Sequence, residues 1–373
     1  MTTNPTDVVF ISSPELWQRG HGPEHPLKPE RLQRTHELLR TFGIFEWGNL
    51  STLEPRMVRR EELSLFHTED YIQAVESLSR GDSTVEPRRY NFGPGDNPVF
   101  EGMYRSEGLK TGSALQAAEA VLSETHRIAF SYSGGLHHAA PDRASGFCVF
   151  NDIAVAISWL KPQVDRIFYL DVDVHHGDGV QDGFYEDPSV YTYSIHQDPR
   201  TLFPGTGHLH EQGRGRGEGF CANLPLPPGT DSTAYLEAFR KTALPLIRRY
   251  DPDILVTQLG VDTHFEDPLA QLSLTTEAHQ ALYRDMKDLA LPWLAFGGGG
   301  YNLDVVPRSW ALAVAAMADR ELPSELPEEY QQKFGGQWLH DGDRTKRIPR
   351  MSAGTGSRVR DIVDQFCRAF ELD

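Results

Sequence analysis

The chain has 373 residues, of which 39% are hydrophobic and 24% charged, an ordinary composition for one large α/β domain with a sizeable core. Its 36 lysines and arginines against 53 aspartates and glutamates give a formal net charge of −17, which argues against direct binding of nucleic acid. No apolar stretch is long enough to span a bilayer, and the first residues lack a signal-peptide pattern, so we expect a cytoplasmic protein without a membrane partner.

The three cysteines, Cys148, Cys221 and Cys367, lie far apart and form no Cys-x-x-Cys pair. This spacing argues against a disulfide framework and against a thiolate metal site. It also indicates a reducing compartment.

Short apolar runs alternate with segments of helical periodicity along the chain. We expect strands over 7–11, 127–130, 166–170, 190–195, 254–259 and 292–296. We expect helices over 31–42, 69–79, 108–123, 152–160, 233–249, 275–290 and 306–317. This alternation predicts one α/β domain over 1–373, with a mainly parallel sheet, helices on both faces, and a site at the carboxyl ends of the strands.

Three connections are rich in turn residues and longer than simple links: 21–30, 88–97 and 203–219. Loops of this kind often form the rim of a functional site. The third contains Arg214 and Arg216 between glycines, which could belong to such a rim or to a solvated surface turn. The C-terminal extension from about 323 to 373 could mediate oligomerisation, but we expect it to pack on the domain.

The stretch 171–179 follows the apolar run 167–170 and is dense in carboxylates and imidazoles. Because side chains of an extended strand alternate between its faces, Asp171, Asp173 and His175 share one face. Carboxylate oxygen and imidazole nitrogen suit a borderline divalent cation, and three protein ligands with one open position are typical of catalytic zinc. The pattern therefore predicts a zinc site, with iron or cobalt as alternatives.

A second strand end, after 254–259, carries Asp262, the natural third ligand beside Asp173 and His175. His264, two residues further on, could ligate a second metal as in binuclear hydrolases. A wall position in the pocket is the simpler expectation for this histidine.

A pair of histidines, His137 and His138, follows the strand expected over 127–130. Adjacent histidines can be metal ligands or acid–base groups. If Asp173, His175 and Asp262 fill the three zinc positions, this pair remains for proton transfer. Asp171 and Asp178 remain as carboxylates that could orient and charge the two imidazoles.

The glycine run 297–300 follows the last predicted strand and precedes Tyr301. It lacks the lysine and hydroxyl residue of a P-loop and the spacing of a dinucleotide fingerprint, so a phosphate cradle is the weaker interpretation. The stronger one is that the glycines bring Tyr301 into the site, where its hydroxyl can donate to an oxyanion.

Together these motifs resemble the zinc-dependent histone deacetylase family, including its bacterial acetoin-utilization-type and acetylpolyamine amidohydrolase relatives. The resemblance runs from the first predicted strand to Trp310. It rests on the following motifs, in this order: His137-His138; Gly146-Phe147-Cys148 with Asn151-Asp152; Asp171-x-Asp173-x-His175-His176-Gly-Asp178-Gly; Phe203-Pro-Gly-Thr-Gly207; Gly260-x-Asp262 with Asp267-Pro268-Leu269; and Gly298-Gly-Gly-Tyr301.

The resemblance implies an open arginase-deacetylase α/β fold with one zinc held by Asp173, His175 and Asp262. Arginases carry an aspartate two residues beyond a histidine of the first cluster, whereas here Gly177 stands two residues beyond His175. A binuclear manganese site is therefore disfavoured.

The resemblance also implies the catalytic roles. His138 would act as general base and acid, His137 would assist electrostatically, and Tyr301 would polarise the amide carbonyl. Asp171 would pair with His137, and Asp178 with His138.

Structural monovalent cations, usually potassium, are a further property that the resemblance implies. The positions that match the site beside zinc are Asp171, Asp173, His175, Ser194 and Ile195. The positions that match a second site are Phe184, Asp187, Val190 and Phe220. Several of these contacts would be made by backbone carbonyls.

The substrate tunnel is the last implied feature. In the family, two aromatic rings line a narrow tunnel that receives the acyl-lysine, and Phe147 and Phe203 match these positions. The other matching substrate positions are Leu269 on the wall, Gly299 in the glycine run, Asp96 on the rim, where it would hold the substrate backbone, and Arg31 near the product exit.

We therefore expect a zinc-dependent amidohydrolase that removes acetyl or other acyl groups from the ε-amine of lysine in proteins or peptides. Acetylated polyamines are the alternative substrates, because the acidic composition would attract a cation and Glu266 lies near the expected tunnel mouth. An alternative of another class is a module that binds acyl-lysine or a partner protein without turnover. The histidine pair and Tyr301 would serve little purpose in such a module.

Overall fold

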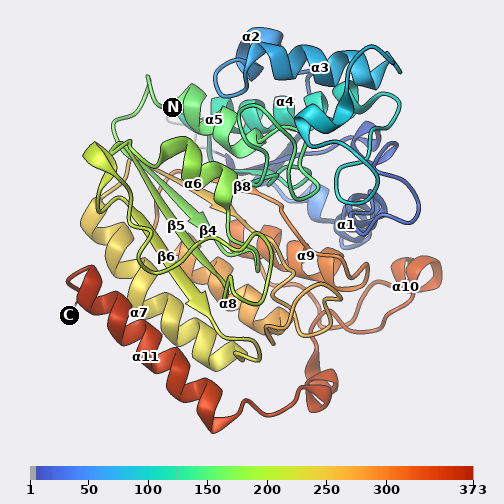
Figure 1. The fold of residues 1–373 in the computed structure, drawn as a ribbon. Helices are drawn as coiled ribbons and strands as arrows, with labels where there is room; N and C mark the ends of the chain where they lie inside the picture. Colours follow the sequence, from blue (N-terminus) through green and yellow to red (C-terminus); the bar gives the residue numbers. More distant parts are fainter. Residues whose placement is uncertain (1–5, 124, 373) are drawn as a thin grey trace, which may run out of the picture.

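The computed structural model describes residues 6–123 and 125–372. Within these residues the strands form one eight-stranded sheet in which every neighbouring pair is parallel (Figure 1). The strand order across the sheet is β2-β1-β3-β8-β7-β4-β5-β6. The strands are β1 (Thr6–Ile11), β2 (Leu50–Leu53), β3 (His126–Ser131), β4 (Ile167–Asp171), β5 (Val190–Gln197), β6 (Cys221–Leu226), β7 (Ile254–Gln258) and β8 (Trp293–Phe296).

Helices connect most of the strands. They are α1 (Glu30–Thr41), α2 (Arg60–Leu63), α3 (Glu69–Ser79), α4 (Met103–Leu122), α5 (Asp152–Leu160), α6 (Asp178–Phe184), α7 (Ser232–Tyr250), α8 (Thr276–Lys287), α9 (Val305–Met317), α10 (Glu328–Phe334) and α11 (Ala353–Ala369). A short 3-10 helix, η5 (Gly342–Arg347), lies between α10 and α11. None of the helices in the described part of the chain has both the length and the apolar character needed to cross a membrane.

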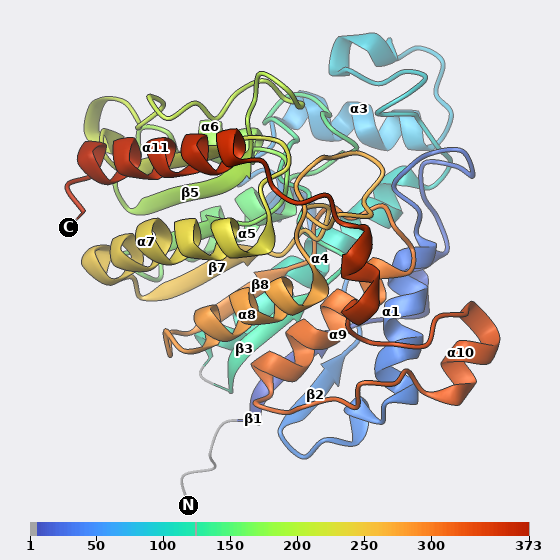
Figure 2. The same cartoon turned by 90° about the horizontal axis from the view of Figure 1, so that it is seen from below.

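Both faces of the sheet are covered by helices, because the inner strands are apolar on both sides. One face packs against α1, α7, α8, α9 and α11 (Figure 2). The other packs against α4, α5 and α6, and α3 adds an outer layer. The predicted α/β architecture with a parallel sheet is confirmed.

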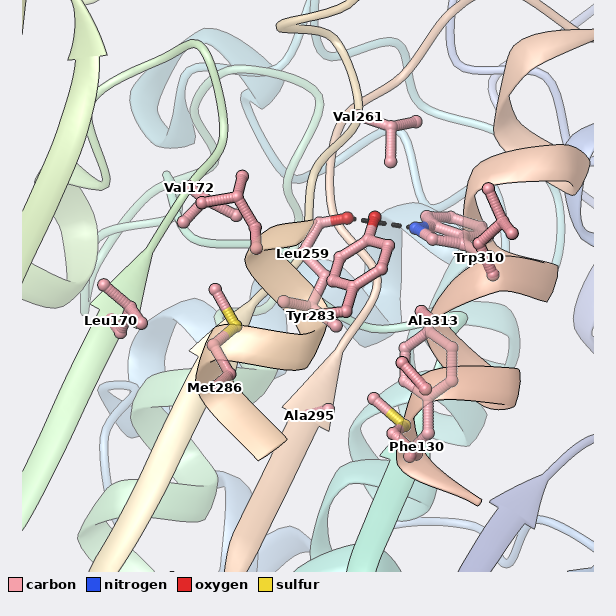
Figure 3. Packing of buried hydrophobic residues seen from close by; sticks show 14 of the residues in the cluster. Phe130, Leu170, Val172, Leu259, Val261, Tyr283, Met286, Ala295, Trp310 and Ala313 are labelled. Atoms are coloured by element: carbon pink, nitrogen blue, oxygen red, sulfur yellow. Dashed lines mark hydrogen bonds between the residues drawn. The ribbon is translucent and has the colours of Figure 1, made fainter. Parts of the chain in front are cut away.

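Part of the core fixes the path of the chain as it leaves β7 (Figure 3). The indole N–H of Trp310 on α9 donates a hydrogen bond of 3.0 Å to the carbonyl oxygen of Leu259. Tyr283 and Met286 of α8 are buried in the same cluster. Because Leu259 stands three residues before Asp262, this bond between helix and strand end helps to place the predicted metal ligand.

Two strands were not predicted, and each has a physical reason. β2 has four residues at the sheet edge, and of these only Leu50 is buried. β6, at the opposite edge, contains Asn223 and Pro225, which are rare inside strands. Edge strands tolerate such residues, so their local sequence carries little strand signal.

Most predicted helices agree with the structure to within a few residues at each end. Helices α3 and α5 have the predicted bounds. Three short helices, α2, α6 and α10, were not predicted. α6 contains Gly179 and Gly183, and α2 and α10 are each no longer than two turns, so their periodicity is too weak to read.

The C-terminal extension contacts the domain along its length. α10 packs near α1, and α11 lies against α7 and β6 (Figure 2). The ring of Phe366 on α11 lies 5.9 Å from that of Tyr193 on β5, measured between centroids. Val359, Val363 and Phe366 of α11 are buried at helical spacing.

Candidate active site and metal centre

Four neighbouring strands, β3, β8, β7 and β4, deliver the predicted site residues from their carboxyl ends. β3 and β4 are consecutive along this part of the chain but lie on either side of β8 and β7 in the sheet. Open α/β sheets bind their ligands in the crevice at such strand ends. The predicted residues therefore meet because of the strand order, although they come from distant parts of the sequence.

The three predicted metal ligands lie together. Nδ1 of His175 is 3.1 Å from Oδ1 of Asp173 and 3.2 Å from Oδ2 of Asp262. All three side chains are buried, and one ligand atom from each lies within 4.8 Å of the others. In the ranges that the structure describes, this is the one buried cluster of histidine, cysteine or acidic residues with such spacing.

Neighbouring groups hold the two carboxylates of this cluster in place. Oδ2 of Asp173 accepts hydrogen bonds from the Gln258 side-chain amide, at 2.6 Å, and from the Gly299 backbone N–H, at 2.7 Å. The backbone N–H of Val174 donates to Oδ1 of Asp262 at 2.8 Å. Sequence analysis missed Gln258, because nothing in its strand marks it as different from a core residue.

The charges in this cluster fit a cation. Burial, followed by repulsion from Asp173, raises the pKa of Asp262 to about 8. Burial opposes a charge on His175, but its hydrogen bonds to Asp173 and Asp262 raise its pKa to about 10. Two buried carboxylates facing one imidazole form a donor set typical of a divalent metal, and a cation there would offset their repulsion.

The two predicted catalytic histidines each face a carboxylate. Nδ1 of His137 is 2.7 Å from Oδ2 of Asp171, and Nδ1 of His138 is 2.6 Å from Oδ1 of Asp178. The Tyr169 hydroxyl also donates to Oδ2 of Asp171, at 2.5 Å. The pairing that the resemblance implied is present in the structure, and Tyr169 is an additional partner that sequence analysis did not identify.

The two histidines differ in their affinity for a proton. Burial disfavours the charged form of His137, but Asp171 and Asp173 outweigh it and raise its pKa to about 9. Burial, together with repulsion from His137, lowers the pKa of His138 to about 4. At neutral pH the pair therefore holds its extra proton on His137, and His138 is neutral and able to act as a base.

Tyr301 lies beside the metal cluster, with its ring 6.5 Å from that of His175 and 5.7 Å from that of Phe147. Burial and the nearby carboxylates of Asp262 and Asp173 raise the pKa of its phenol well above the usual value. The hydroxyl therefore stays protonated at neutral pH and can donate a hydrogen bond.

A narrow cavity of about 20 Å³ is lined by His137, His138, Phe147, Gly299 and Tyr301, among others, and Phe147 is thus the one predicted tunnel ring in its lining. Phe203 stands over the same site, with its ring 5.0 Å from that of His138. Its side chain is 44% exposed, as expected at a tunnel mouth. The structure thus places both predicted aromatic rings at the site.

Phe147 adopts an unusual backbone conformation, with φ at 70°. Its backbone N–H donates to Oδ1 of Asn97 at 3.0 Å, and its carbonyl lies 2.9 Å from Nε2 of His21. The ring of His25 packs edge-on against the ring of Phe147, and its Nε2 lies 3.1 Å from the carbonyl of Asp96. Two of the loops predicted as rims, 21–30 and 88–97, therefore meet beside Phe147.

Arg31 and Leu269 are two further predicted substrate residues. The buried Arg31 guanidinium donates to the carbonyl of Gly298 at 2.5 Å and lies 5.3 Å from the Trp310 ring centroid. Leu269 is half-buried, and its backbone N–H donates to Oδ1 of Asp267 at 2.9 Å. Leu269 is not among the residues that line the narrow cavity.

The positions predicted for potassium lie on β4, β5 and the segments next to them. Asp171 on β4 pairs in register with Ser194 on β5, and Ile195 follows Ser194 in the chain. The Ser194 hydroxyl lies 2.8 Å from Nδ1 of His196. In the second set, three backbone carbonyls already accept a backbone N–H group. The carbonyl of Phe184 accepts the N–H of Asp187, that of Asp187 accepts the N–H of Val190, and that of Phe220 accepts the N–H of Thr192. Each carbonyl retains a second lone pair.

His264 does not join the metal cluster. Its buried ring places Nε2 2.8 Å from Oδ2 of Asp341, a residue of the C-terminal extension. A second metal held by His264 is therefore not supported, and the histidine has a structural contact instead. Arg214 pairs with Glu186 at the surface, where both side chains are mostly exposed, in agreement with the solvated-turn alternative.

Comparisons with known proteins agree with this geometry. A family model described as "Histone deacetylase domain" matches residues 25–317. The acetoin utilization protein AcuC of Bacillus subtilis (strain 168) is 41% identical over 360 residues, and the match covers 92% of each chain. AcuC of Staphylococcus xylosus is 36% identical over 358 residues, which cover 91% of this chain and 92% of the relative.

Solved structures of HDAC homologs share the whole fold. One, described as complexed with SAHA, superimposes with a TM-score of 0.87 at 32% identity, covering 96% of this chain and 99% of its own. Another, from Aquifex aeolicus, has a TM-score of 0.86 at 31% identity with the same coverage.

A parallel sheet with a buried carboxylate–imidazole cluster at its carboxyl edge defines a deacetylase-type amidohydrolase of the arginase-deacetylase fold. This chain belongs to the histone deacetylase family, with relatives of the acetoin utilization type. The predicted family and fold are both confirmed.

Proposed function

We propose that this protein is a zinc-dependent amidohydrolase that removes acetyl groups from the ε-amine of lysine in proteins or peptides. The observation that carries the proposal is that His137 and His138, each paired with a carboxylate, line one narrow cavity together with Tyr301 and with Asp173 of the Asp173–His175–Asp262 cluster. Each of these groups has a task in amide hydrolysis, whereas a protein that only binds acyl-lysine would need none of the proton-transfer groups.

The metal would be held by Asp173, His175 and Asp262. When bound, zinc would polarise the substrate carbonyl and make a water molecule more acidic. Structural potassium ions at the two sets of positions named above are part of the same proposal.

His138 would move the proton. It is the neutral member of the pair and would accept a proton from the attacking water at its Nε2 atom. Asp178 fixes the ring by accepting the Nδ1 hydrogen and would stabilise the imidazolium once it forms. The same imidazolium would then protonate the nitrogen of the leaving lysine, which completes the hydrolysis.

His137 and Tyr301 would stabilise charge. His137, which Asp171 holds in its charged form, would keep its proton throughout. Its positive charge would stabilise the negative charge that develops on the oxygen atoms bonded to the substrate carbon. The Tyr301 hydroxyl would donate a hydrogen bond to the former carbonyl oxygen. Phe147 and Phe203 would enclose the acyl-lysine stem between their rings and exclude water from it.

The rim favours a peptide over a polyamine. Glu266, the carboxylate that could have attracted a polyamine, is paired with Arg344 and lies 3.8 Å from Nη1 of Arg347. Its charge is therefore offset, while the exposed Asp96 remains at the mouth to receive the substrate backbone.

A second candidate, hydrolysis of acetylated polyamines, has one observation in its favour. Beside Phe147 an open hollow of about 370 Å³ is lined by Glu24 and Asp96, among others. Two carboxylates there would attract a cationic chain that extends from the tunnel.

Turnover of a substrate panel distinguishes these candidates. The panel contains acetyl-lysine peptides, longer acyl-lysine peptides, and acetylated spermidine and putrescine, each assayed with chelator and again after zinc is restored. Chelator-sensitive turnover that favours the peptides supports the proposal, and a preference for the polyamines supports the second candidate. Binding of acyl-lysine without turnover, at one zinc per chain, would contradict both and indicate a binding module.

A further inference from the structure

The loop that follows β7 holds the backbone of Tyr301. Oδ2 of the buried Asp267 accepts the backbone N–H of Tyr301 at 2.9 Å, and Oδ1 accepts that of Leu269 at the same distance. Next to them, the side-chain amide of Asn302 donates to the carbonyl of Glu266 at 3.1 Å. Glu266 and Asp267 of the loop after β7 therefore form hydrogen bonds with the consecutive residues 301 and 302 of the loop after β8.

These hydrogen bonds are needed because the glycine-rich segment before Tyr301 can adopt many backbone conformations. Gly298 and Gly300 have φ angles of 125° and 133°, a region that side-chain-bearing residues rarely adopt. Glycines set no preferred direction for the chain that follows them. The direction of Tyr301 therefore depends on contacts such as the one from Asp267.

The same loop is also bound by the C-terminal extension. The Glu266 backbone N–H donates to Nδ1 of His264 at 3.1 Å, so the ring hydrogen sits on Nε2 and is donated to Asp341. The other carboxylate oxygen of Asp341 accepts from Arg308 at 2.9 Å, and the Thr276 backbone N–H donates to Oδ2 at 2.8 Å. Asp341 thus joins the loop to helices α8 and α9.

A second contact comes from η5. The Arg344 guanidinium donates to the carboxylate of Glu266, whose side chain is only 18% exposed. Arg344 and Asp341 are three residues apart and contact two residues of the loop, Glu266 and His264, that are themselves two residues apart. Asp341, just before η5, and Arg344, within η5, therefore both bind this loop.

We propose that Asp267 is a positioning residue for Tyr301, and that Asp341 and Arg344 of the C-terminal extension hold Asp267 in place. The proposal rests on the catalytic role assigned above to Tyr301. It gives the extension a task in the reaction, although none of its described residues lines the narrow cavity. The chain of contacts runs from Arg344 through Glu266 to Asp267, and from there to the backbone of Tyr301.

The test compares Arg344→Ala with Arg344→Lys and with a matched control, Arg284→Ala. Arg284 pairs with Glu321 at the surface, and its side chain forms no hydrogen bond or ion pair with the described residues of the loop that carries Asp267. Hydrogen exchange is followed by mass spectrometry on peptides that cover 264–272 and 297–304. Metal content and steady-state kinetics are measured on the same samples.

In Arg344→Ala we expect amide exchange of these two peptides to rise by about threefold to tenfold, with other regions unchanged. We expect kcat to fall by a similar factor, about threefold to tenfold, with KM and metal content retained, because a misdirected Tyr301 affects the transition state more than binding. Arg344→Lys should restore most of the loss, and Arg284→Ala should change neither exchange nor kcat.

Two further variants sharpen the result. Asp267→Asn should show the same exchange pattern more strongly, with kcat lower by about tenfold or more. In a Tyr301→Phe background, Arg344→Ala should cause little further loss of kcat, because both changes act on the same hydroxyl.

Three outcomes would overturn the proposal: unchanged exchange at 297–304 in Arg344→Ala, faster exchange throughout the chain, or a full additional loss in the Tyr301→Phe background. Absence of turnover by the unmodified protein would count against the proposed function alone. In that case the exchange data still decide whether the C-terminal extension positions Tyr301.

Discussion

Nε2 of His137 and Nε2 of His138 lie 3.0 Å apart, and each ring directs its Nδ1 atom at its own carboxylate. Since each Nδ1 atom faces a carboxylate, Nε2 is the atom at which each ring gains or loses its second proton. In the resting pair the electrostatics place the extra proton on His137 and leave Nε2 of His138 unprotonated. Two adjacent residues of the same type acquire opposite tasks because their surroundings differ.

The pH dependence of the reaction follows from this difference. With a pKa of about 4 for His138 and about 9 for His137, kcat/KM should rise as the pH passes upward through the first value and fall beyond the second. Because the two groups are coupled, the limbs of the profile belong to the pair. The check is a profile of kcat/KM between about pH 3 and 10 with an acetyl-lysine peptide.

Asp178→Asn should weaken the base. The carboxylate of Asp178 favours the protonated form of His138, so its loss lowers the pKa of His138 and moves the acidic limb to lower pH. We expect kcat to fall by about 10²-fold or more, because the ring also loses the partner that fixes its orientation. Asp142→Asn, an exposed aspartate paired with Arg143, is the control. An acidic limb that stays in place would contradict the assignment of His138 as the base.

Tyr301→Phe should remove one hydrogen-bond donor and little else. We expect kcat to fall by about 10²–10³-fold with KM near its original value, as for the loss of an oxyanion-hole donor. Zinc content, measured by mass spectrometry, should stay at that of the unmodified protein, since Tyr301 is not a ligand. Tyr185→Phe, at the end of α6, serves as the control. Turnover at the original rate would exclude the role assigned to Tyr301.

Gly299→Ala should disturb the metal cluster directly. A Cβ atom at this position would lie 2.0 Å from Oδ2 of Asp262 and 2.7 Å from Oδ2 of Asp173, distances that force atoms to move. We expect a loss of unfolding free energy of about 1–3 kcal/mol and weaker zinc retention during dialysis against a chelator. Gly48→Ala is the control, because no atom lies within 4 Å of its added Cβ. Equal zinc retention in the two variants would show that the cluster does not need the close approach of Gly299.

The sequence was most informative where side chains of one short segment share a task. Asp173 and His175 are two residues apart at a strand end, and the alternation of an extended chain was enough to place them on one face. The same reasoning brought Asp262 to the cluster, because the carboxyl ends of parallel strands share one edge of the sheet. The sequence also marked the histidine pair, because two adjacent histidines follow a predicted strand.

Contacts between distant segments could not be read in the same way. Gln258 looks like any polar residue at the end of a strand, yet its amide fixes Asp173. Asp341 is separated from His264 by 77 residues and belongs to a stretch without periodicity, so no local pattern linked them. For this reason His264 was considered as a metal ligand, and Glu266 as a free carboxylate at the mouth. In both cases the partner lies in the C-terminal extension, whose role depends on tertiary structure alone.

Asp341 should make the free energy of unfolding fall at acidic pH. Although burial disfavours its charge, the hydrogen bond from His264 and the nearby Arg308 hold the pKa of Asp341 well below its usual range. The charged Asp341 therefore makes its full contribution to the free energy of unfolding above about pH 4, near the pKa of aspartate in an unfolded chain. This contribution is lost as the pH falls from there toward the lower pKa of Asp341 in the folded protein. Asp341→Asn should lower the free energy of unfolding at pH 7 by about 3 kcal/mol, because Arg308 would remain buried without its carboxylate.

Urea unfolding of the two proteins across this pH range checks the prediction. The difference between the original protein and Asp341→Asn should be constant from about pH 7 to pH 5 and should shrink below about pH 4, where Asp341 begins to protonate on unfolding. Asp251→Asn is a matched control, because Asp251 is a 78% exposed partner of Arg166, and its replacement should change the free energy of unfolding by less than about 1 kcal/mol. A difference that grows as the pH falls would mean that Asp341 is not held in its charged form by His264 and Arg308.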